Sequence, residues 1–185
     1  LYFIYKIVST INLCKQLKSE YPEYNFVPIY WMATEDHDFD EINYFNFKDQ
    51  KFRWNRESKG PVGRLSTEGL DLVYEAFSKE IGLGNNAKYL LDLFKKSYLE
   101  HQNLADATRF LANELFKNEG LVIIDGDAKE LKKLFVPYAK NELIQQTSFK
   151  KVNETLTLLE NYNVQVNPRE INLFYIQNEL RERII

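Results

Sequence analysis

Two short apolar runs that each end in acidic residues place the strongest constraint on the fold of this chain. Residues 26–33 read FVPIYWMA and continue into TEDHDFDE, whereas residues 121–124 read LVII and lead to Asp125 and Asp127. Apolar runs without polar alternation are typical of strands that are covered on both faces, as in a parallel sheet. Helical patterns fill the sequence around the two runs, so we expect a layered α/β sheet.

Hydrophobic periodicity predicts the remaining elements. Helices are expected near residues 2–19, 67–80, 87–99, 103–118, 128–145 and 149–161, with Asn86 and Asn103 as N-caps. Alternating aromatic and polar residues predict a β-hairpin over residues 44–55, with Phe45, Phe47, Phe52 and Trp54 paired across one face. The apolar-rich segments 172–176 and 181–185 around Asn178 and Glu179 suggest a second hairpin.

Composition excludes several classes of protein. The 185 residues are 44% hydrophobic and 28% charged, which is enough apolar material for a core and rules out global disorder. The single cysteine, Cys14, forms no internal disulfide and supplies no cysteine-based zinc site. No apolar run approaches the roughly 20 residues of a membrane helix, so we expect a cytoplasmic protein. Because the only methionine is Met32, we also expect a piece of a longer protein.

The acidic block after the first run is the main candidate site. Glu35, Asp36, His37 and Asp38 stand there without a neighbouring Lys or Arg, and crowded like charges need a cation, an amine ligand or hydrogen bonds to compensate them. Ligands of open α/β sheets bind beyond the carboxyl ends of strands. A solvated acidic loop in front of a helix N-terminus explains the block about equally well. We predict no metal site, because the Asp-His-Asp spacing is not that of helical ligands.

A second group of polar residues could complete the same cleft. Asp125 and Asp127 follow the second run, although for Asp127 alone a helix cap is the favoured interpretation. Arg64, in a rigid turn over residues 60–64, offers a guanidinium for a carboxylate or phosphate. Basic residues near Phe52 and Trp54 could form a stacking platform for single-stranded nucleic acid. The net charge of −3 instead favours a solvated hairpin with an aromatic core face.

Residues 27–43, VPIYWMATEDHDFDEIN, closely resemble the signature of the BshC family, the cysteine-adding enzymes of bacillithiol biosynthesis. Corroborating segments follow in the family's order: LYFIYK at 1–6, GPVGR at 60–64, GLVIID at 120–125 and NLFY at 172–175. Tyr44 departs from the pattern, since many members have His there. The resemblance implies a Rossmann-type, nucleotidyltransferase-like parallel sheet with flanking helices and an inserted β-hairpin.

The resemblance also implies how the chain is divided. Residues 1–145 would form the Rossmann-like core, and residues 146–185 would begin a connecting segment. The family's first strand and Gly-rich turn would lie before Leu1, and its C-terminal coiled coil, through which a homodimer is expected, would lie beyond Ile185. The chain would thus be a central fragment, expected to be inactive alone.

The resemblance further implies a reaction, the attachment of cysteine to glucosaminyl malate in the last step towards bacillithiol. Its catalytic group would be Glu35, Asp36, His37 and Asp38, where a carboxylate or the histidine takes the proton of the attacking amine. Its substrate-binding residues would be Thr34, Lys6, Arg64, Asp125 and Asp127. ATP is expected to activate the carboxyl group, although the sequence leaves the co-substrate open. No nucleic acid or membrane partner is expected. The alternative is a non-catalytic α/β module that binds a nucleotide or nucleic acid.

Overall fold

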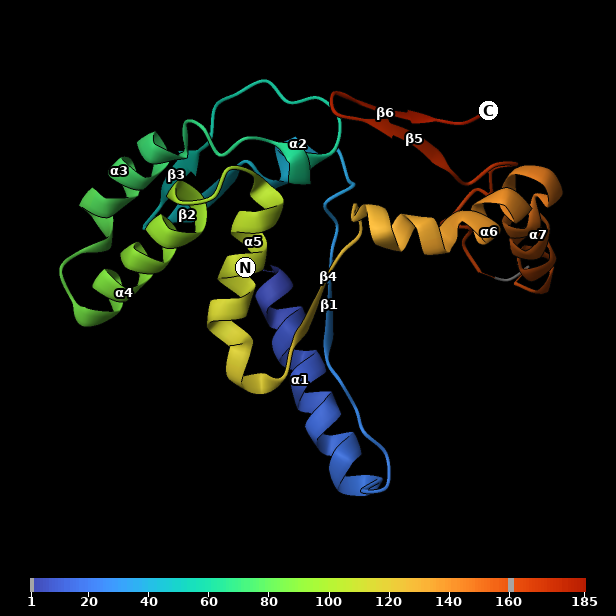
Figure 1. Cartoon of the computed structure of the whole chain (residues 1–185), viewed down its shortest axis with the longest axis horizontal. Helices are drawn as coiled ribbons and strands as arrows, with labels where there is room; N and C mark the ends of the chain where they lie inside the picture. Colours follow the sequence, from blue (N-terminus) through green and yellow to red (C-terminus); the bar gives the residue numbers. More distant parts are fainter. Residues whose placement is uncertain (1, 160–161) are drawn as a thin grey trace.

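A computed structural model describes residues 2–159 and 162–185, and it is a mixed α/β structure built on one parallel pair of strands (Figure 1). β1 (Ile29–Met32) lies parallel to β4 (Val122–Asp125), with Ile29 opposite Val122 and Met32 opposite Asp125. The two apolar runs therefore pair as the sequence predicts. Because the strands are parallel and in register, their carboxyl ends lie at the same edge.

Helices cover one face of this strand pair. α1 (Tyr2–Glu20) packs against β1, and α5 (Leu104–Phe116) packs against β4. On the covered face, Phe3 stacks on Tyr30 with 5.7 Å between ring centroids, and Met32 is buried. Side chains alternate between the faces of a strand. On the other face Ile29 and Trp31 are 53% and 56% exposed, so the expectation of strands covered on both faces is wrong for the described residues.

The inserted hairpin consists of β2 (Tyr44–Phe47) and β3 (Gln50–Arg53). Lys48 and Asp49 form its turn with φ of 47° and 63°, the left-handed conformation that tight hairpins favour. Phe45 lies opposite Phe52, and their rings stack 5.2 Å apart. Phe77 of α3 (Leu70–Ile81) meets both rings edge-on, which places the main hydrophobic core between the hairpin and the helices.

The helices that follow begin close to their predicted residues. α4 (Asn85–Phe94) continues into a π-helical turn, η2 (Lys95–Leu99). The Asn103 cap of α5 is confirmed, since its Oδ1 accepts a hydrogen bond from the Asp106 amide at 2.9 Å. The Asn86 cap is wrong, because α4 begins one residue earlier and Gly84 supplies the extended backbone that precedes the helix.

Short helices also lie in the connections between these elements. They are α2 (Phe39–Ile42), η1 (Val62–Arg64) and η3 (Lys117–Glu119). Beyond β4 come α6 (Lys129–Gln145), α7 (Thr147–Leu158) and a second hairpin, β5 (Phe174–Gln177) and β6 (Leu180–Arg183). The second hairpin is thus confirmed. The helix predicted over 149–161 begins at Thr147, and its last two residues lie outside the described part of the chain.

Glu142 links α6, α7 and the segment that leads to β5. Its buried carboxylate accepts hydrogen bonds from the Ser148 amide and hydroxyl at 3.0 and 2.9 Å, and a longer one of 3.4 Å from the Asn172 amide. The division of the chain at residues 145 and 146 remains a prediction. Within residues 2–159 and 162–185, the helices lack the combination of length and apolar character that crossing a bilayer requires.

Candidate functional site

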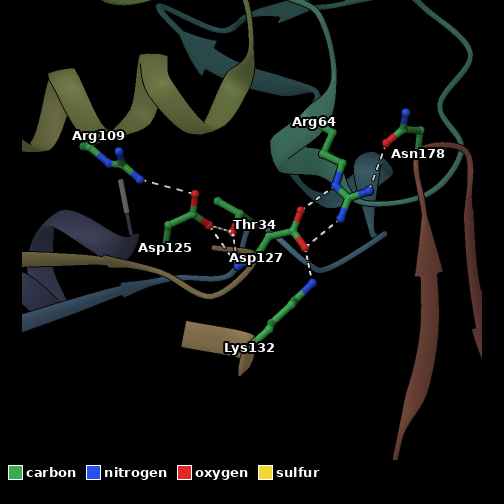
Figure 2. Close-up of polar contacts among 7 residues, drawn as sticks. All are labelled: Thr34, Arg64, Arg109, Asp125, Asp127, Lys132 and Asn178. Carbon is green, nitrogen blue, oxygen red and sulfur yellow. Dashed lines mark hydrogen bonds and ion pairs between the residues drawn. The ribbon is translucent and has the colours of Figure 1, made fainter. Parts of the chain in front are cut away.

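The carboxyl ends of β1 and β4 meet through Thr34 and Asp125 (Figure 2). The Thr34 hydroxyl donates a hydrogen bond to Asp125 Oδ1. The same oxygen accepts a 2.9 Å bond from the backbone amide of Asp127, and that amide also lies 3.2 Å from Thr34 Oγ1. The expected meeting of the two strand ends is therefore confirmed for Thr34, Asp125 and Asp127.

Asp127 is held by two cations. Arg64 donates from Nε to Oδ2 at 2.5 Å and from Nη2 to Oδ1 at 3.0 Å, and Lys132 in the first turn of α6 also donates to Oδ1. Burial acts to raise the pKa of Asp127, but the bonds and charges of Arg64 and Lys132 outweigh it and hold the pKa below its ordinary value. The predicted helix cap is wrong, because the carboxylate faces these cations and Ala128 precedes α6.

Three residues of this network were not predicted as site residues from the sequence. Arg109 of α5 donates to Asp125 Oδ2 at 3.3 Å, and Asn178 in the turn between β5 and β6 accepts a 3.0 Å bond from Arg64 Nη1. The third is Lys132. Its place one turn into the helix after Asp127 is a signal that the sequence offered, whereas Arg109 and Asn178 reach the site only through tertiary structure.

These ion pairs make the edge less acidic than the sequence predicts. Asp125 and Asp127 are faced by Arg64, Arg109 and Lys132, so the carboxylates do not present an uncompensated acidic surface. Both oxygens of Asp127 are engaged. A substrate ammonium group would have to compete with Arg64 and Lys132 for Asp127.

A cleft of about 710 Å³ opens beside this network. It lies between η1, the amino end of α5, the end of β4 and the turn of the β5–β6 hairpin, and its volume is typical of small-molecule sites. Arg56 and Lys59 add positive charge to its wall. Gly63 is required here, because a Cβ at that position would lie 2.5 Å from the Cβ of Thr34.

Glu35 lies on the opposite side of the strand ends from the cleft. Thr34 and Glu35 lie in a turn after β1, where the Thr34 hydroxyl meets Asp125 whereas Glu35 Oε1 lies 3.5 Å from Trp31 Nε1. A Cβ on Gly126 would lie 2.4 Å from Glu35 Oε2. That oxygen is buried and has no hydrogen-bond partner among the described residues. None of the acidic block, Glu35, Asp36, His37 and Asp38, lines the cleft; the residue before it, Thr34, does.

The other three residues of the block form a separate group with Arg181 of β6. His37 Nδ1 lies 2.9 Å from Arg181 Nη1, 3.2 Å from Asp36 Oδ1 and 3.6 Å from Asp38 Oδ1. Desolvation acts to raise the pKa of Asp36, but the hydrogen bond from the His37 backbone amide and the charge of Arg181 bring it below its ordinary value. One ligand atom from each of Asp36, His37 and Asp38 fits within 4.8 Å, but a metal ion there would meet the Arg181 guanidinium.

Two predicted features do not come to the cleft. Lys6 lies on α1 with its Nζ 5.8 Å from the centre of the Tyr2 ring, beside a different groove, so its substrate-binding role remains a prediction. Phe52 and Trp54 are 6% and 5% exposed. Their rings are packed in the core, so the hypothesis that they form a base-stacking platform is wrong.

The parallel strands, covered by helices on one face, and the polar cleft at their carboxyl ends fit a Rossmann-like domain. The chain belongs to the BshC family, since residues 1–185 match the family model described as "Bacillithiol biosynthesis BshC, N-terminal Rossmann-like domain". The fold class expected from the sequence is thereby confirmed.

Curated relatives agree with this assignment. The chain is 69% and 68% identical, over its whole length, to proteins of Flavobacterium johnsoniae and Flavobacterium psychrophilum, and covers 35% of each. It is 32% identical to a Bacillus cereus protein, with 84% of the chain and 30% of that protein aligned. All three are named "Putative cysteine ligase BshC". The chain thus spans about a third of the length of these relatives.

Proposed function

We propose that the whole protein attaches cysteine to glucosaminyl malate, as the last step towards bacillithiol. The bond formed is an amide between the cysteine carboxyl group and the sugar amine. Membership of the BshC family supports a ligase. We assign the proposed function to this domain because the ends of β1 and β4 meet at one cleft, where Thr34, Asp125 and Arg64 converge.

The acidic block supplies the proton chemistry of this proposal. An amine that attacks a carboxyl carbon loses a proton, and a carboxylate within reach can accept it. In this proposal Glu35, whose buried Oε2 has no partner among the described residues, takes the proton of an amine held beyond the strand ends on the side away from the cleft. Asp36 and Asp38 provide further carboxylates on the same segment, beside the half-exposed ring of His37.

Activation of the cysteine carboxyl group is the chemistry that ATP would supply when bound. Arg64 is poorly placed to bind its phosphates, because Nε, Nη1 and Nη2 are all used on Asp127 and Asn178. Arg56 is also partly engaged, since Nε and Nη1 donate to the carbonyl oxygens of Glu57 and Ser66, so Lys59 is the cation of the cleft wall that fits phosphate oxygens better. The co-substrate and the expected homodimer remain proposals, the second testable by sedimentation of the whole protein.

Removal of charge at constant shape tests the enzymatic role of the block. Asp36→Asn and Asp38→Asn in the whole protein are expected to abolish product formation from cysteine, glucosaminyl malate and ATP, as followed by mass spectrometry, while the protein stays folded. Asp49→Asn, in the exposed turn of the first hairpin, is the matched control. Normal activity in both variants would reduce the block to a solvated acidic loop.

A further inference from the structure

One nitrogen of the His37 ring, Nδ1, lies close to a guanidinium, which can only donate hydrogen bonds. The same nitrogen lies close to two carboxylates, which can only accept them. Arg181 Nη1 lies 2.9 Å from Nδ1, closer than the carboxylate oxygens of Asp36 and Asp38 at 3.2 and 3.6 Å. A guanidinium carries only N–H donors and stays protonated, whereas an ionised carboxylate only accepts. Nδ1 can therefore be an acceptor for Arg181 or a donor to Asp36, but not both.

The shorter contact decides between the two states. If Nδ1 carried a hydrogen, that N–H would point at an N–H of Arg181. We infer that Arg181 is a positioning residue that holds His37 as the neutral tautomer with its proton on Nε2. In terms of the proposed function, on which this step rests, His37 then donates a hydrogen bond to the substrate from Nε2, and a carboxylate rather than His37 takes the amine proton.

Arg181 is itself held in place for this task. Its guanidinium carbon lies 3.9 Å from the centre of the Phe174 ring on the paired strand, a cation–π contact that orients the planar group. Its Nε is buried and has no hydrogen-bond partner among the described residues. The hydrogen bond to His37 comes from Nη1. Half of the His37 side chain remains exposed, which leaves the ring accessible to a ligand.

The hairpin that carries Arg181 is docked on the rest of the domain at two further points. Asn178 accepts the hydrogen bond from Arg64. Gly60, with φ of 70°, lies so close to the hairpin turn that a Cβ there would stand 2.7 Å from the Asn178 carbonyl oxygen and 2.8 Å from the Leu180 amide. The contact between Arg181 and His37 is thus one of three that fix β5 and β6 beside the acidic block.

The other histidine provides an internal reference for a test. His101 Nδ1 lies 3.0 Å from the carbonyl oxygens of Lys96 and Ser97, which only accept, so this ring carries its proton on Nδ1. The chain contains two histidines, and the structure thus assigns them opposite tautomers. Nitrogen NMR of histidine-labelled chain distinguishes protonated from bare ring nitrogens. Loss of signals in His37→Gln identifies the ring.

Substitutions of Arg181 complete the experiment. In Arg181→Gln we expect the ratio of tautomers at His37 to shift by about fivefold or more towards Nδ1–H, as one hydrogen bond implies. Arg181→Lys, which keeps a cationic donor, should retain the Nε2–H form. Arg183→Gln, on the exposed part of the same strand, is the control and should change nothing.

Two results would overturn the inference. One is a wild-type His37 that carries its proton mainly on Nδ1, a measurement that does not depend on any variant folding. The other is an unchanged ratio of tautomers in a folded Arg181→Gln chain. Neither needs substrate, so failure of the cysteine-adding activity would refute the proposed function and leave the tautomer assignment standing.

Discussion

Arg64 binds Asp127 through both carboxylate oxygens, at 2.5 and 3.0 Å, and so joins η1 to the loop that follows β4. The two residues are 63 positions apart, and Asp127 is largely buried, with a side chain that is 10% exposed. A bidentate pair of this kind fixes orientation as well as distance. Asp127 therefore fixes the position of the Arg64 side chain, which lines the cleft.

Asp127→Asn should destabilise the domain. The change leaves Arg64 and Lys132 facing a neutral amide that cannot accept all their hydrogen bonds, at an expected cost of about 2 kcal/mol. Urea unfolding measures it, with Asp49→Asn as the exposed control. A loss no larger than the ~0.5 kcal/mol typical of surface substitutions would mean that the pair contributes little.

The same carboxylate predicts a loss of stability in acid. The pKa of Asp127 is lowered from 3.8, so its contribution to the free energy of unfolding is fully present above that value and is lost as the pH falls below it. Unfolding followed from about pH 5 to pH 3 should show a steeper decline for wild-type protein than for Asp127→Asn. Equal slopes would show that Asp127 has the same pKa folded and unfolded.

Gly126→Ala should affect Glu35 more than the fold. The added Cβ would lie 2.4 Å from Glu35 Oε2, the end of a flexible side chain that can turn away at a cost of about 1 kcal/mol. If Glu35 takes the amine proton, product formation by the whole protein should fall at least tenfold. Gly84→Ala is the control, since a Cβ there has nothing within 4 Å. Unchanged activity with a displaced Glu35 would exclude this residue as the proton acceptor.

Residues 1–185 alone are expected to bind ATP weakly and to add no cysteine. Arg64 is committed to Asp127 and Asn178, which leaves few cationic donors for a triphosphate in the cleft. Isothermal titration calorimetry checks this directly. Micromolar affinity, about −8 kcal/mol, would show that the phosphates are held within these residues, with Arg56 and Lys59 as the first candidates for substitution.

Local patterns predicted the elements of the fold and one part of the site. The apolar runs indicated parallel strands, and the pairing of their ends brought Thr34 to Asp125 as expected. The turn that follows β1 separates Thr34, which meets Asp125, from Glu35, which meets Trp31, and local sequence patterns do not show the direction of side chains in a turn. Arg109 and Asn178 could not be predicted, because their partners are distant in sequence and only tertiary packing brings them together.

The docking of β6 on His37 has a consequence for biosynthesis. The contact joins residues that are 144 positions apart in the sequence, so it closes a very long loop. Closing such a loop costs conformational entropy, which opposes formation of the contact. During translation, Thr34, Arg64 and Asp127 have all left the ribosome well before Arg181 does. The acidic block therefore emerges as an unfinished surface, and its histidine acquires a defined protonation pattern only when β6 has been synthesised.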